Sequence, residues 1–198
     1  MNVKEEVPGL NDIPEVYFES ADHWRQWLEE YHDNKTGINL ILYKVGHEKA
    51  SMRWEDAVRV ALCFGWIDST VKSLGEGKRR QYFCQRKPKS TWSKLNKTYI
   101  KELHSSGLIH KSGLNKIAEA KKDGSWTALD DVENGVVPID LQQAFDKNST
   151  AYKNYANYSR TYQKSYLYWL NQAKRPETRA RRIKEIIQLC EAGVKSRT

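Results

Sequence analysis

The sequence predicts an α+β protein with a small, mostly antiparallel sheet packed with helices, followed by an all-helical C-terminal part. Two observations lead to this prediction. Strand-like runs of β-branched and aromatic residues end before residue 87, whereas the later periodic segments have the three- and four-residue spacing of amphipathic helices. Gly75 and Gly77 separate two strand-like runs, 66–73 and 79–86, which favours a β-hairpin and therefore antiparallel pairing.

The first part of the chain supplies the other strands and two helices. Residues 15–18 are expected to form a short strand, and Ser20 is a good N-cap for the helix that follows. One face of that helix carries an apolar stripe of four residues, Trp24, Trp27, Leu28 and Tyr31. The apolar run 38–45 is typical of a central strand with Lys44 at its exit. Ser51 is expected to cap a second helix that ends at Gly65.

Helices are expected throughout the rest of the chain. One opens at a cap among residues 90–93, and a shorter one runs from Ser112 to Gly124. Beyond residue 140, Ser159 is expected to cap a helix and Pro176 to occupy the first turn of the last one. The domain plan has four parts: a flexible N-terminus at 1–13, an α+β domain at 14–126, an acidic loop at 127–139 and a helical subdomain at 140–198.

The composition is that of a globular protein without membrane spans or metal sites. Seven Trp, eleven Tyr and 39% hydrophobic residues are typical of globular proteins and argue against disorder. No apolar run approaches the roughly 18 residues of a membrane span, so no transmembrane segment is expected. The acidic start does not resemble a secretory signal, which favours a cytoplasmic location. Neither the three Cys nor the five His have metal-ligand spacing, so we expect no metal and no cofactor.

Charge is unevenly distributed. Between Lys72 and Lys101, ten Lys and Arg residues accompany one acid, Glu76, whereas residues 1–71 carry a net charge of −6. The segment 146–198 is also strongly basic, at +8. The basic segments could bind nucleic acid, phosphate or anionic lipid, or they could pair with acidic segments of the same chain.

We expect the arginines of the last helix to pair with the acidic N-terminal segment. The interleaved apolar residues of this helix require it to dock on the body of the protein; these are Ala180, Ile183, Ile187 and Cys190. The tyrosines that precede this helix recur every three or four residues. They fit packing, with a nucleotide-stacking platform as the alternative, and are Tyr152, Tyr155, Tyr158, Tyr162 and Tyr166.

The most unusual local chemistry surrounds Asp68. This carboxylate emerges directly from the apolar run that contains Trp66, opposite a cationic strand that ends at Arg86. We expect Asp68 and Arg86 to lie within salt-bridge reach, directly or through a neighbouring Arg. Trp92 lies within the basic segment, with Ser93 beside it. Arginine offers paired donors and indole offers a stacking face, so these residues predict a site for a polar or anionic ligand. The alternative is that the tryptophans belong to the core and Asp68 to a closed ion pair.

Three stretches carry a family resemblance: ALCFGWIDS at 61–69, RKPKSTWSKLNK at 86–97 and AKRPETRARRIKEII at 173–187. Together they are similar to the YdeI/OmpD-associated family, the bacteriocin-protection proteins, over about Pro14 to Gly193. The resemblance implies a bacterial cytoplasmic protein linked to tolerance of bacteriocins or cationic antimicrobial peptides, without a defined reaction.

The resemblance also marks candidate ligand-binding positions. They are Trp66, Asp68, Arg86, Trp92, Ser93 and Asn96, with Lys44 and Glu55 on the preceding strand and helix. None carries a catalytic role assigned by the family. We therefore expect a non-enzymatic binding protein. An enzyme acting on an anionic metabolite is the alternative, with Asp68 as acid or base and Arg86 as anion clamp, and a nucleic-acid-binding protein is a third possibility.

Overall fold

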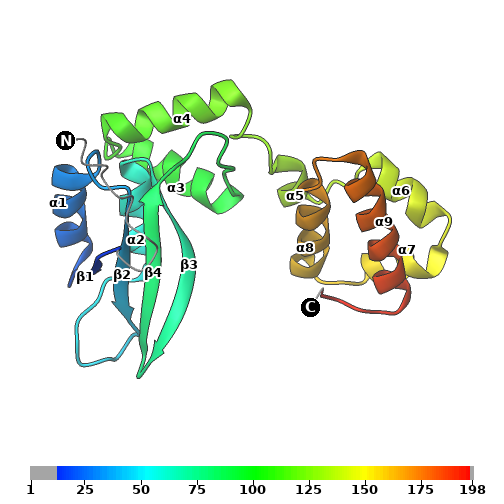
Figure 1. Cartoon of the computed structure of the whole chain (residues 1–198), viewed down its shortest axis with the longest axis horizontal. Helices are drawn as coiled ribbons and strands as arrows, with labels where there is room; N and C mark the ends of the chain where they lie inside the picture. The colour runs from blue at the N-terminus through cyan, green and yellow to red at the C-terminus, as the bar shows by residue number, and fades with distance from the viewer. Residues whose placement is uncertain (1–12, 197–198) are drawn as a thin grey trace, which may run out of the picture. The chain divides into compact units, whose positions relative to one another are not determined.

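The computed structural model describes residues 13–196, which form two compact units (Figure 1). Within the described residues, the first unit comprises 13–90 and 95–126, and the second comprises 91–94 and 127–196. The segment 1–13, expected to be flexible, lies outside the described residues except for Ile13. No helix in the range 13–196 combines the length and the apolar character needed to span a bilayer.

The first unit contains a four-stranded sheet and four helices. Along the chain these are β1 (Glu15–Tyr17), α1 (Ala21–Tyr31), β2 (Gly37–Tyr43), α2 (Trp54–Cys63), β3 (Trp66–Gly75), β4 (Lys78–Gln85), α3 (Lys94–Ser105) and α4 (Lys111–Asp123). The strand order is β1-β2-β4-β3, with β1 parallel to β2 and the other two pairings antiparallel. The predicted α+β class is confirmed. Within the described sheet only β1 pairs in parallel, and the remaining pairings are antiparallel, as predicted.

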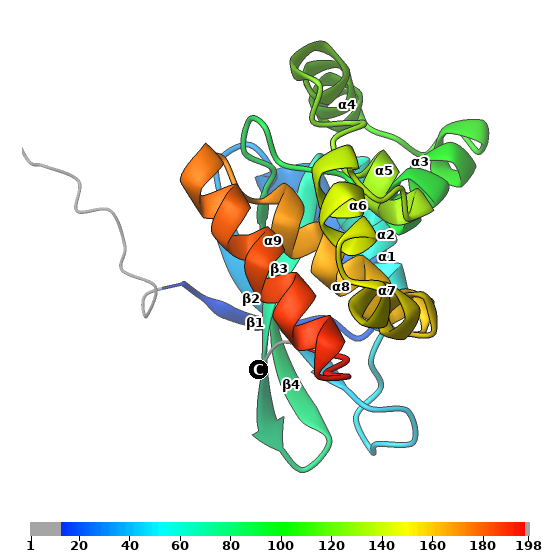
Figure 2. The ribbon, with the colours of Figure 1, turned by 90° about the vertical axis from the view of Figure 1, so that its right-hand side faces the viewer.

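The predicted β3–β4 hairpin is confirmed. Glu76 and Gly77, the two residues between the strands, both have positive φ, as the central residues of a type I′ turn require. Gly75 also has positive φ, which glycine adopts without strain. Trp66 pairs with Gln85 at one end of the hairpin, and Gly75 pairs with Lys78 at the other. The turn and the loop that follows β2 lie at the same end of the sheet in both views (Figures 1 and 2).

Aromatic residues fill the core of the first unit. Trp24 and Trp66 are fully buried, and each satisfies its indole N–H with a backbone carbonyl, of Ala57 and of His32 respectively, over 3.1 Å. Phe83 packs edge-on against Trp24. Of the apolar stripe predicted for α1, Trp24 and Leu28 are buried in the core, and Trp27 and Tyr31 are partly buried. Ser20 caps the helix as predicted, its side chain accepting from the backbone N–H of His23.

Ser51 does not cap α2, contrary to the prediction. The helix begins two residues later, after Arg53, without a side-chain cap. Ser51 Oγ instead accepts a hydrogen bond from the backbone N–H of Tyr43 over 3.2 Å. The reason lies in the sheet: β1 ends at Tyr17, opposite Ile41, so the N–H of Tyr43 has no strand to donate to on that side. Ser51 supplies the missing acceptor.

The second unit is helical. Its helices are α5 (Asp130–Asn134), α6 (Ile139–Asp146), α7 (Ser149–Ala156), α8 (Arg160–Asn171) and α9 (Pro176–Glu191). The segment 127–139, expected to be a loop, thus contains the short helix α5. Pro176 occupies the first turn of α9 as predicted, whereas Ser159 makes no side-chain capping bond to α8.

The apolar face of α9 is rotated from the predicted one. Ile186 and Cys190 are buried, Ile183 and Ile187 are partly buried, and Ala180 is exposed. The five tyrosines singled out between residues 152 and 166 also divide between core and surface. Three of them are buried, Tyr155, Tyr158 and Tyr166, and two are exposed, Tyr152 and Tyr162. Packing therefore accounts for three of the five positions.

Candidate ligand pocket of the first unit

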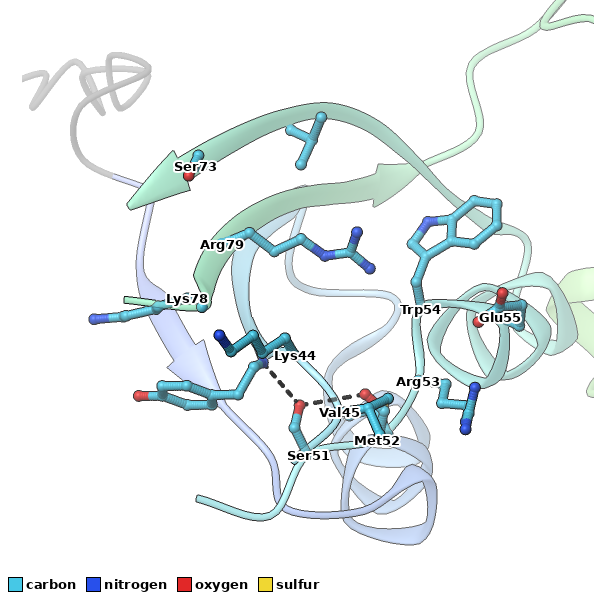
Figure 3. A pocket seen from close by; sticks show the side chains of 13 residues that line it. Lys44, Val45, Ser51, Met52, Arg53, Trp54, Glu55, Ser73, Lys78 and Arg79 are labelled. Carbon is cyan, nitrogen blue, oxygen red and sulfur yellow. Dashed lines mark hydrogen bonds between the residues drawn. The ribbon is translucent and has the colours of Figure 1, made fainter. Parts of the chain in front are cut away.

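The turn end of the sheet holds a pocket of about 490 Å3, here named the hairpin pocket (Figure 3). It is bounded by the end of β2, the loop after it, the start of α2 and the β3–β4 hairpin. Its lining residues are Tyr43, Lys44, Val45, Ser51, Met52, Arg53, Trp54, Glu55, Val71, Ser73, Gly77, Lys78 and Arg79. This volume is typical of a small-molecule site.

Gly77 allows β2 and the hairpin turn to meet closely. Its carbonyl accepts a hydrogen bond from the backbone N–H of Lys44 over 2.8 Å. A Cβ at Gly77 would lie 2.7–2.8 Å from carbons of the Lys44 side chain. The aliphatic part of Lys44 therefore lies directly over the turn backbone, a position that any larger residue at 77 would disturb.

The pocket is predominantly cationic. Arg79 and Lys78 are half-buried and Lys44 is exposed. Among the described residues, none of these three takes part in a salt bridge. Figure 3 shows the Arg79 side chain reaching across the pocket toward Trp54. The next residue, Arg80, pairs instead with Glu15 over 2.9 Å, because successive side chains of a strand point to opposite faces.

Asp68 does not line the hairpin pocket but supports one of its walls. Its Oδ2 accepts hydrogen bonds from Trp54 Nε1 over 2.8 Å and from Gln81 Nε2 over 3.1 Å. Gln81 is only 4% exposed and also donates to the carbonyl of Ser69. The carboxylate thus fixes the indole of Trp54, which does line the pocket. The sequence did not identify Trp54 as a pocket residue or as a partner of Asp68.

Asp68 forms no salt bridge in the described part of the chain, either with Arg86 or with a neighbouring Arg, contrary to the expectation. Asp68 lies opposite Phe83, and Arg86 follows three residues later, about 10 Å along an antiparallel strand. Asp68 remains near enough to favour the charged form of Arg86. Burial is the larger effect and lowers the pKa of Arg86, which is 4% exposed, to about 10. Arg86 donates to Ser90 Oγ, and its backbone N–H donates to the Gly65 carbonyl.

The other predicted positions do not form one site, because some are buried in the core and they belong to different units. Trp66 is core, and the indole of Trp92, which belongs to the second unit, is 1% exposed. Ser93 also belongs to the second unit, whereas Asn96 lies on α3 of the first. Of the eight predicted residues, Lys44 and Glu55 line the hairpin pocket. The principal cation of the pocket, Arg79, was counted only as part of the basic segment; strand alternation across the hairpin could have identified it.

Neither the acidic groups nor the thiols suggest a metal centre or a nucleophile. Within residues 13–196, no group of three or more His, Cys, Asp or Glu is arranged to hold a metal ion. Burial raises the pKa of the Cys63 thiol, and that of Cys190 to about 12, so both are neutral at physiological pH. The hairpin pocket combines aromatic walls with cations, a set of side chains that can hold an anion.

Comparison with known families assigns each part of the chain. Residues 16–116 match the model of a domain of unknown function (DUF8412), and residues 134–193 match the family described as bacteriocin-protection, YdeI or OmpD-associated. No curated protein and no solved structure matched.

The two matches divide the motifs that suggested the resemblance. The segment 173–187 lies within the bacteriocin-protection match, and the segments 61–69 and 86–97 lie within the other. The predicted family is thus confirmed through the C-terminal part. The chain belongs to the family of the domain of unknown function DUF8412, whose model covers half of its length, and it carries a C-terminal domain of the bacteriocin-protection, YdeI or OmpD-associated family.

Proposed function

We propose that the protein contributes to tolerance of bacteriocins or cationic antimicrobial peptides by binding an anionic ligand in the hairpin pocket, without catalysing a reaction. One observation carries the proposal: the half-buried Arg79 points across a partly apolar pocket and has no salt-bridge partner among the described residues. A cation in such surroundings is stabilised when an anion binds beside it.

The pocket walls indicate the rest of the ligand. Tyr43, Met52, Trp54 and Val71 provide apolar and aromatic surface next to Arg79 and Lys44. An anionic group attached to an apolar chain or ring would satisfy both. A cationic pocket repels a cationic peptide, so the protein would act through an anionic ligand and not by sequestering the peptide itself.

Octyl phosphate is a suitable probe, since it joins a phosphate to an apolar chain. We expect isothermal titration calorimetry to show binding of octyl phosphate and much weaker binding of octanol or inorganic phosphate. Arg79→Gln should weaken octyl phosphate binding about tenfold or more, the scale of a hydrogen bond to a charged group.

Arg80→Gln is the matched control, because Arg80 is the next residue of the same strand and lies on the opposite face, paired with Glu15. Its affinity for octyl phosphate should equal that of the parent protein. When the two variants are expressed in a bacterial strain that lacks its own copy of this protein, the two strains should differ in their tolerance of a cationic peptide. Equal affinities and equal tolerance for the two variants would refute the proposal.

A further inference from the structure

The groove between α3 and α4 is a second concave site in the first unit, separate from the hairpin pocket. It has a volume of about 430 Å3, and the two helices line it with the same spacing. Lys97, Ile100, Lys101 and His104 follow the i, i+3, i+4, i+7 pattern on α3, as Leu114, Ile117, Ala118 and Lys121 do on α4. Each helix therefore turns one continuous face to the groove. We call it the lysine groove.

An indole forms part of its wall. The backbone N–H of Trp126 donates to the Ala120 carbonyl at the end of α4, which places the side chain beside the groove. The ammonium groups of Lys97 and Lys121 lie 5.6 and 5.5 Å from the centroid of the Trp126 ring. Both ammonium groups lie over the ring. An anion bound between them would draw the ammonium groups toward itself, and a ring attached to that anion could then stack on the indole.

The lysine groove is positive, and the acids of its own helices are engaged elsewhere. Glu102 pairs with Arg59 over 2.6 Å, and Glu119 pairs with Lys116 over 3.0 Å. Among the described residues, the salt bridges include neither Lys101 nor Lys121. The lining itself contains no acid, in contrast to the hairpin pocket with its Glu55.

Apolar surface completes the site. Leu114 is 42% exposed, and the more deeply buried Ile100 and Ile117 also line the groove. We infer that the lysine groove binds a small planar aromatic anion, such as an aryl phosphate, with the ring against Trp126 and the phosphate among the lysines. This inference does not depend on the hairpin pocket.

The test uses the full chain and 1-naphthyl phosphate as the probe. We expect calorimetry to show binding of 1-naphthyl phosphate. Binding of 1-naphthol, which lacks the phosphate, and of inorganic phosphate, which lacks the ring, should each be at least tenfold weaker. In a 15N-labelled sample, amide shifts should change at Ala118, Lys121 and Trp126. Lys101→Gln combined with Lys121→Gln should weaken binding about tenfold or more.

Two controls accompany this variant. Lys122→Gln removes a charge from the neighbouring residue of α4, which does not line the groove, and Arg79→Gln alters the hairpin pocket; both should keep the parent affinity. Exposed lysines on a helix tolerate Gln, and far-UV circular dichroism verifies the fold. Unchanged affinity in the double variant, shifts confined to the hairpin pocket, or equal binding of 1-naphthol would overturn the inference. Binding of an acidic amphipathic peptide but not of 1-naphthyl phosphate would also overturn it, in favour of a peptide partner.

Discussion

Trp54 donates its indole N–H to the Asp68 carboxylate over 2.8 Å, and this contact joins the start of α2 to the edge strand β3. Trp54 lines the hairpin pocket and Asp68 does not, so Asp68 acts on the pocket through Trp54. We therefore expect Asp68, the candidate acid or base of the sequence, to act as a positioning residue for Trp54. Its second donor, Gln81, holds it from the neighbouring strand β4.

The first prediction concerns this contact. Asp68→Ala leaves the Trp54 and Gln81 donors without their acceptor and should lower the free energy of unfolding by about 1–2 kcal/mol. Asp68→Asn keeps an acceptor oxygen of nearly the same shape and should cost less than half as much. Urea unfolding measures both values. Octyl phosphate affinity should fall in the Ala variant and largely survive in the Asn variant; equal behaviour of the two would show that Asp68 does not position Trp54.

The second prediction separates backbone strain from pocket geometry. Gly77 and Gly46 both have positive φ, so replacing either by Ala should cost about 1 kcal/mol of stability. Only at Gly77 would the added methyl meet the Lys44 side chain; at Gly46 it would meet no atom within 4 Å. Gly77→Ala should therefore weaken octyl phosphate binding and Gly46→Ala should not. Similar affinities for the two variants would place Lys44 outside the ligand site.

The third prediction is a pH dependence in the second unit. The hydrogen bond from Arg179 is the main reason that the pKa of Asp140 lies below its usual value. A carboxyl with a lowered pKa in the folded state stabilises the protein above its unfolded pKa, and the contribution is lost as the pH falls through the folded value. The Arg179 to Asp140 pairing should thus lose its effect below about pH 4.

Asp140→Asn is the variant that tests it. Because Asp140 is 43% exposed, the difference in unfolding free energy at pH 7 should be at most about 1 kcal/mol, and it should shrink toward zero near pH 2. Chemical unfolding between pH 2 and pH 7 measures the difference. A gap between parent and variant that stays constant across this range would show that the ion pair does not contribute.

The fourth prediction concerns the basic helix α9. Arg179 pairs with Asp140, and the guanidinium of Arg182 lies 4.9 Å from the Trp169 ring centroid and donates to the Trp169 carbonyl. These contacts within the second unit leave fewer arginines for a polyanion, so duplex DNA should bind weakly. Fluorescence anisotropy of a labelled duplex at several salt concentrations measures this. Strong binding with a slope near −0.9 per phosphate contacted, lost in Arg181→Glu with Arg182→Glu, would instead support the nucleic-acid alternative.

Local patterns in the sequence determined most of the elements. The α1 stripe, the Ser20 cap, the hairpin at Gly75 and Gly77, and Pro176 at the start of α9 each depend on residues within one or two turns of the chain. Such features were predictable because backbone propensity and capping act over short distances. The α+β class followed from their order along the chain.

Only the tertiary structure decided which side chains meet. Strand register places Asp68 opposite Phe83, so the carboxylate accepts from Trp54 and Gln81 and not from Arg86. The early end of β1 makes Ser51 an acceptor for Tyr43 and not a helix cap. Alternation along β4 sends Arg79 into the pocket and Arg80 to Glu15. Each outcome depends on which strands are neighbours and on where each strand ends. Two residues adjacent in sequence can have entirely different partners, because a strand directs their side chains to opposite faces.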